Sequence, residues 1–115
     1  MAEVGAGDLT NRVRFERRAL DANGDPLGAW TAAGDPVWAQ LTWLRGTEAA
    51  MQQRLEGRQP VVITVRASMF TRQINPAWRA VNARDAAQRF AILTVSPART
   101  PGFLDLLAVL GGATG

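Results

Sequence analysis

Hydrophobic and polar residues alternate with a period of two in several separate stretches of the chain. From Asn11 onward, Val13 and Phe15 alternate with charged residues, which is the pattern of a strand with one buried face. The stretch VWAQLTWL at 37–44 shows the same period and carries a tryptophan on each face, Trp38 and Trp43. We therefore expect this second strand to be covered on both sides, with Trp43 in the core.

Four further strands are predicted in the second half of the chain. The β-branched run PVVITVR at 60–66 places alternate side chains on one face. Residues 78–96 predict a strand, a tight turn around NARDA and a second strand. The run FLDLLAVL at 103–110 fits a helix or a strand, and its short length between Pro and Gly favours a closing strand. Six strands predict a mainly β fold, a small antiparallel barrel or sandwich.

Two connections interrupt this pattern. Residues 20–30, LDANGDPLGAW, are rich in turn-forming residues and predict a surface loop. Residues 45–58 read as a helical or loop insertion, in which Thr47 can cap a helix that carries Glu48 in its first turn. Its narrow apolar stripe consists of Leu44, Met51 and Leu55. The insertion either plugs its own barrel or leaves it to pack on a neighbouring subunit or to line a channel.

The whole pattern predicts one β domain over residues 11–110, with a flexible arm at 1–10 and a flexible tail at 111–115. At 115 residues, 47% of them hydrophobic, the chain suits a single core. No apolar run approaches the roughly 18 residues that cross a bilayer, and no basic segment followed by an apolar stretch begins the chain. We therefore expect a soluble protein that makes no membrane contact.

The chain contains neither Cys nor His. This excludes disulfides, thiolate nucleophiles, Ser-His triads, Cys/His zinc sites and imidazole acid-base catalysis. Asp21, Asp25 and Asp35 lie close in sequence, but Asp-Ala-Asn-Gly-Asp is first of all a turn. We expect no enzymatic activity, no catalytic residues, no cofactor and no metal.

All thirteen positively charged side chains are Arg, and the net charge is +3. A GC-rich genome is one explanation for the use of Arg in place of Lys. Whatever the cause, guanidinium groups make planar, bidentate contacts with carboxylates or phosphates. Arg12, Arg14 and Arg18 share the outward face of the first strand, which is either solvated or pairs with carboxylates of another subunit, such as Asp85 or Glu56. For DNA phosphates, the better candidates are Arg45, Arg54 and Arg58. Trp38 is expected to contact a neighbour, because interfaces favour Trp and Arg anchors.

The order of these elements resembles the head-tail joining proteins of long-tailed phages, also called head-completion or stopper proteins. The similarity runs from Leu9 to Leu110. Its most specific pieces are Arg12-Val13, the Asp-x-x-Gly turn followed by Trp30, Val-Trp-Ala at 37–39 and Gly-Thr-Glu at 46–48. The sequence departs from the family pattern in ASMFTRQINPAW and in PARTPG.

The resemblance implies a small β-barrel protein, made in the bacterial cytoplasm, that forms a ring at the neck of a phage or a gene transfer agent. Six copies would match tail symmetry and twelve the portal. The implied partners are an adaptor or portal-side protein, a tail terminator or tail tube protein, and packaged double-stranded DNA. The candidates for subunit interface or channel are Arg45, Glu48, Met51, Arg54, Leu55, Arg58, Trp38, Arg12 and Arg14. The alternatives are a tail terminator and a free-standing small-barrel nucleic-acid-binding protein.

Overall fold

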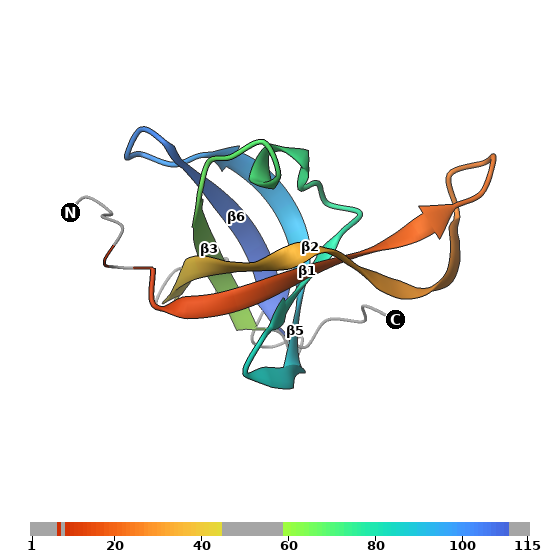
Figure 1. Cartoon of the computed structure of the whole chain (residues 1–115), viewed down its shortest axis with the longest axis horizontal. Coiled ribbons are helices and arrows are strands. Elements are labelled where there is room, and N and C mark those ends of the chain that lie inside the picture. The colour runs from red at the N-terminus through yellow and green to blue at the C-terminus, as the bar shows by residue number, and fades with distance from the viewer. Residues whose placement is uncertain (1–6, 8, 45–58, 111–115) are drawn as a thin grey trace.

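Six antiparallel strands form a closed barrel in the computed structural model, which describes residue 7 and residues 9–44 and 59–110. The strands are β1 (Asn11–Leu20), β2 (Pro26–Trp43), β3 (Gln59–Arg66), β4 (Arg79–Asn82), β5 (Asp85–Pro97) and β6 (Phe103–Leu110). Their order around the barrel is β1-β2-β3-β6-β5-β4, and β4 returns to β1 (Figure 1). The predicted mainly β class and the six strands are confirmed. The predicted insertion at 45–58 lies outside the described residues.

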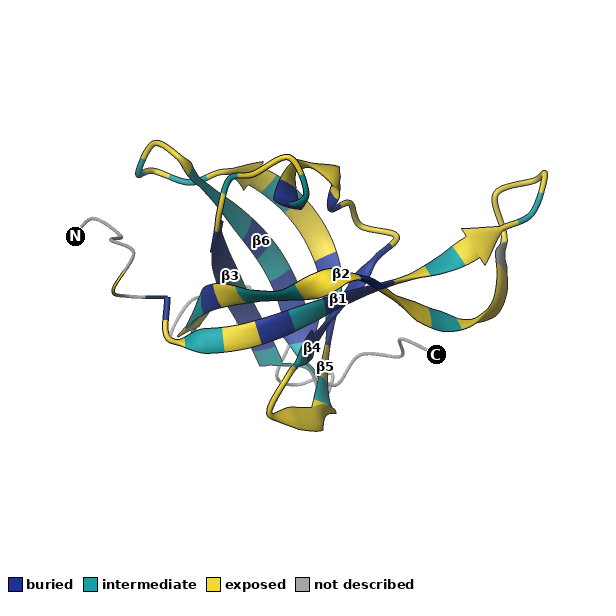
Figure 2. Ribbon diagram, in the orientation of Figure 1, coloured by how far each residue is buried: buried dark blue, intermediate teal, exposed yellow. Residues whose placement is uncertain are grey.

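The core is built from the inward faces that the alternation predicts. Val13 and Phe15 of β1 are fully buried, and so are Val61, Ile63 and Val65 of β3. Phe90 of β5 and Leu106 of β6 meet them in the same hydrophobic cluster. Buried residues accordingly line the inside of the barrel, while exposed ones alternate with them along the strands (Figure 2).

The barrel closes along a short seam between β1 and β4. Only four residue pairs join these strands, from Val13 opposite Asn82 to Glu16 opposite Arg79. The run at 103–110 is a strand, as predicted, and β6 pairs with β3 on one side and β5 on the other. The final strand therefore joins the β1–β2–β3 half of the barrel to β5 and β4.

Beyond the barrel, β1 and β2 continue as a projecting hairpin (Figure 1). The prediction of a loop over 20–30 is wrong for most of its length, because β1 reaches Leu20 and β2 begins at Pro26. The turn that joins the two strands, residues 21–25, does lie within the predicted turn-forming stretch. The Asp21 carboxylate accepts hydrogen bonds from the backbone N–H groups of Asn23 and Asp25, both at 2.9 Å. Pairing with β1 extends the strand through residues that have little strand preference of their own.

The connection from β3 to β4 runs across one end of the barrel (Figure 1) and contains a short 3-10 helix, η2 (Thr71–Gln73). The Thr71 hydroxyl donates to the Arg66 carbonyl at 2.7 Å and fixes the start of this connection. The Phe70 ring packs 6.3 Å from Phe15 and 5.9 Å from Trp78. Trp78 is buried, whereas Trp43 packs against the core but stays half-buried. Trp43 is thus less central than predicted.

Gly34 of β2 lies directly under this connection. Its φ is +72°, and a Cβ at this position would lie 2.7 Å from Cε1 of Phe70. We expect Gly34→Ala to lower the free energy of unfolding by about 2–4 kcal/mol, because a left-handed backbone and overpacking act together. Urea denaturation followed by tryptophan fluorescence measures the loss.

Gly102→Ala is the matched control for Gly34→Ala. The φ of Gly102 is +87°, and a Cβ there has no neighbour within 4 Å. This variant should show the backbone effect alone, about 1–2 kcal/mol. Equal losses in the two variants would mean that Phe70 moves aside and that the close approach has no energetic role.

Candidate interaction surfaces

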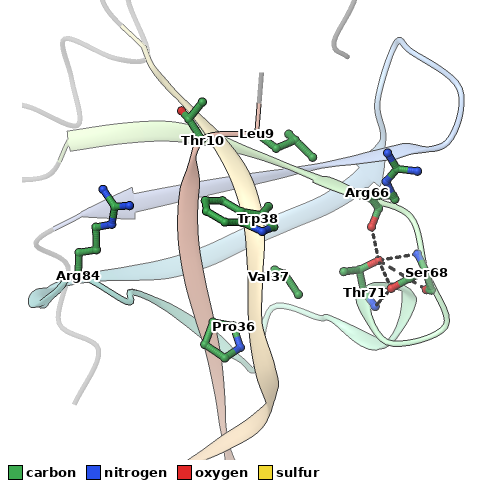
Figure 3. A pocket seen from close by; sticks show the side chains of 9 residues that line it. All are labelled: Leu9, Thr10, Pro36, Val37, Trp38, Arg66, Ser68, Thr71 and Arg84. Atoms are coloured by element: carbon green, nitrogen blue, oxygen red, sulfur yellow. Dashed lines mark hydrogen bonds between the residues drawn. The ribbon is translucent and has the colours of Figure 1, made fainter. Parts of the chain in front are cut away.

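An apolar groove of about 790 Å³ lies beside the start of β1. Leu9, Pro36, Val37 and Trp38 supply its apolar lining, and Arg66 and Arg84 stand on either side of Trp38 (Figure 3). We call this cavity the Trp38 groove. It combines apolar surface with guanidinium groups, which suits a partner that carries both apolar side chains and carboxylates.

Trp38 is exposed and yet held in place. It pairs with Arg12 across β1 and β2, and the Arg12 guanidinium carbon lies 5.0 Å from the centroid of its ring. The cation-π contact orients the indole, while 47% of the residue remains accessible. The outward position predicted for Trp38 is confirmed. Whether a neighbour covers it stays a prediction.

The outer end of the hairpin, residues 19–27, forms a second surface, which we call the hairpin tip. Leu20 and Leu27 are 55% and 51% exposed. Asp21 and Asp25 add two negative charges, and this stretch of sequence contains no Arg or Lys. Figure 2 shows the hairpin as mostly exposed, away from the barrel. The tip is therefore both apolar and acidic.

A charged cluster lies between these two surfaces, at the β1–β4 seam. Arg79 is buried, and its Nε and Nη2 atoms lie 2.7 and 2.6 Å from Oε1 of Glu16. The guanidinium carbon of Arg79 is also 4.5 Å from the ring centroid of Trp30, and that of Arg18 is 4.7 Å from the same centroid. This arrangement packs the base of the hairpin onto the barrel.

Sequence reasoning missed the buried ion pair. The alternation predicts Glu16 as one of the charged residues between the core positions of β1, and it gives no role to Arg79. The two residues are 63 positions apart and meet only through the β1–β4 register. No local signal in the sequence identifies such a pair.

The predicted outward Arg face of β1 is only partly confirmed. Arg12 is exposed, but Arg14 is half-buried and its Nη2 lies 3.3 Å from Oε2 of Glu16. Arg18 is also half-buried and lies against Trp30. A fully solvated face is thus wrong for Arg14 and Arg18, because both contact side chains of their own chain. The remaining candidates, Arg45, Glu48, Met51, Arg54, Leu55 and Arg58, lie outside the described residues, as does Glu56.

Within ranges 9–44 and 59–110, no group of three or more Asp, Glu, His or Cys side chains is placed to hold a metal ion. Asp21 instead accepts the backbone hydrogen bonds of its own turn. In the described part of the chain, no helix is long and apolar enough to cross a membrane.

The sequence matches the phage head completion protein family over residues 4–111, which is nearly its whole length. The chain belongs to this family. The resemblance seen in the sequence is thereby confirmed. A search of curated proteins found no match to this head completion protein.

One chain of a solved structure is similar to this head completion protein. It comes from the virion of a native gene transfer agent particle and is 27% identical in sequence, with a TM-score of 0.57. The match covers 86% of this head completion protein and 92% of the virion chain. The likeness therefore spans the barrel rather than one motif.

Proposed function

We propose that this head completion protein is a structural component of a phage or gene transfer agent particle and forms a ring at the neck. The family match over residues 4–111 carries the proposal. The similar chain from a gene transfer agent virion supports a location in the particle, because the match covers 92% of that chain. In this role the protein joins the adaptor or portal side to the tail and acts without catalysis.

Six copies would suit this position, since six matches the symmetry of the tail. A ring subunit needs surfaces that bind its neighbours, and the exposed Trp38 and the hairpin tip are candidates for them. The ring would also surround packaged double-stranded DNA. Arg45, Arg54 and Arg58 are the sequence's candidates for that channel, where guanidinium groups would contact phosphate.

A deletion experiment tests the role in joining. In a strain that produces the particle, removal of the coding sequence should leave heads and tails separate in negative-stain electron micrographs. Heads without this protein should also lose packaged DNA, which a nuclease-protection assay measures. Expression of the wild-type chain in trans should restore joined particles. Joined, DNA-filled particles in the deletion strain would contradict the proposal.

A map of the particle neck tests the position. We expect density for this barrel between the adaptor and the tail, repeated around the particle axis. Density that caps the tail tube, on the far side of the joint, would make the chain a tail terminator. Density in the capsid shell, or none in the particle, would refute a neck function.

A further inference from the structure

We propose that the hairpin tip of one copy docks in the Trp38 groove of the next, so that copies of this chain join head to tail. This inference rests on the proposed ring and names the contact that would build it. The occupant of the groove is therefore a second copy of this chain.

The apolar parts of the two surfaces match. The tip presents Leu20 and Leu27, each more than half exposed. The groove presents Trp38 in its centre, with Leu9 and Val37 in its lining (Figure 3). A cavity of about 790 Å³ is within the range of roughly 300–1,000 Å³ typical of binding pockets. Docking would remove both leucines and the open part of the indole from water.

The charges of the two surfaces are opposite. The tip carries Asp21 and Asp25, whereas the groove is flanked by Arg66 and Arg84, both exposed. Arg12, stacked on Trp38, adds a third positive charge. Guanidinium groups form the strongest, bidentate hydrogen bonds with carboxylates, and opposite charges at the rim of an apolar contact fix its register.

A single chain cannot satisfy both surfaces by itself. The groove includes Leu9 and Thr10, just before β1, and the tip begins where β1 ends. The ten residues of β1 span about 33 Å at about 3.3 Å per residue, in a molecule whose longest extent is 43 Å. Figure 1 shows the hairpin directed away from the barrel.

A contact between two different surfaces has a defined consequence for assembly. After two copies bind, the pair keeps one free tip and one free groove, so further copies add in the same sense. Such heterologous contacts produce rings when the rotation between copies closes. The hairpin also gains from docking, because a two-stranded ribbon alone is marginally stable in water.

Charge reversal tests the pairing. Asp25→Arg should weaken each contact about tenfold, which corresponds to a loss near 1.4 kcal/mol, and should thereby lower the fraction of joined particles. Adding Arg84→Asp or Arg66→Asp should restore joining. Arg99 is an exposed residue of the β5–β6 turn. Adding Arg99→Asp gives the same net charge as the other two double variants and should not restore joining. The proposal is overturned if, of the three added substitutions, only Arg99→Asp restores joining, or if none of them does.

Cross-linking tests the contact even if charge reversal impairs folding. The natural chain has no cysteine, so the introduced thiols are the only ones that this chain carries. A Leu27→Cys, Thr10→Cys double variant, treated in purified particles with a short bis-maleimide, should give a ladder of covalent multimers. Leu93→Cys, Thr10→Cys is the matched control and should give none, because Leu93 is an exposed leucine of β5 outside the hairpin.

Two results would separate this inference from the function on which it rests. If the Leu27→Cys variant is present in joined particles but gives no ladder, the docking is wrong and the neck function stands. If the chain is missing from purified particles that are otherwise joined, both proposals fail. A ladder with the Leu93→Cys variant alone would move the interface to β5 and also overturn the docking.

Discussion

Glu16→Ala is expected to lower the free energy of unfolding by about 3–5 kcal/mol, a loss typical of breaking a buried ion pair from one side. The substitution leaves the guanidinium of Arg79, which is 8% exposed, without the carboxylate 2.6 Å away. It also acts at the β1–β4 seam, where only four residue pairs hold the barrel closed. Guanidinium chloride denaturation, followed by circular dichroism, measures the change.

Two further variants show whether the charge or the packing at Glu16 is responsible. Glu16→Leu with Arg79→Met removes both charges and should lose much less than Glu16→Ala, since an apolar pair can replace a buried ion pair. Arg14→Ala removes only the half-buried partner of Glu16, 3.3 Å away, and should change the free energy by about 0–1 kcal/mol. A double variant as unstable as Glu16→Ala would refute the electrostatic explanation.

Phe90→Ala should destabilise the barrel by about 3–5 kcal/mol. Phe90 is fully buried in the inner face of β5, with its ring centroid 6.0 Å from that of Trp43. Truncation leaves a cavity in the middle of the core, which the closed sheet cannot fill by collapse. Because small domains have only about 5–15 kcal/mol of stability, the loss should be visible as a clear fall in the denaturation midpoint.

Leu93→Ala is the matched control for Phe90→Ala. Leu93 lies three residues further along β5 and is 41% exposed. Its truncation should change the free energy of unfolding by roughly 0.5 kcal/mol or less. If the two variants lose similar amounts, the inner and outer faces assigned to β5 are wrong.

The sequence predicts the barrel well wherever one face of a strand is buried. Alternation placed Val61, Ile63 and Val65 on a single face, and all three are fully buried in β3. It did not predict that β2 starts at Pro26, because the residues after the turn have little strand preference and gain their conformation by pairing with β1. The alternation also does not predict the order of the strands in the barrel, because periodicity carries no information on which strands pair.

The candidate surfaces also include one feature that the sequence predicts and one that it does not. The position of Trp38 on the face opposite Val37 and Ala39 follows from the alternation and is predicted by it, whereas a covering neighbour stays a prediction. The Trp38 groove is not predicted, because its lining comes from segments far apart in the chain, from Leu9 to Arg84. Only the folded barrel brings such residues together.

The β1–β4 seam also determines when the barrel can form after synthesis. The hairpins β1–β2, β4–β5 and β5–β6 pair neighbouring segments, and β3–β6 pairs residues up to 51 positions apart, whereas the seam joins residues at least 63 positions apart. Long-range pairing is slow, because the chain must lose the entropy of a large loop before any contact repays it. We therefore expect the seam to form last, with β1 and β4 as bare edges until it does. In a cell that makes many copies at once, the time to closure sets how long those edges can pair wrongly with one another.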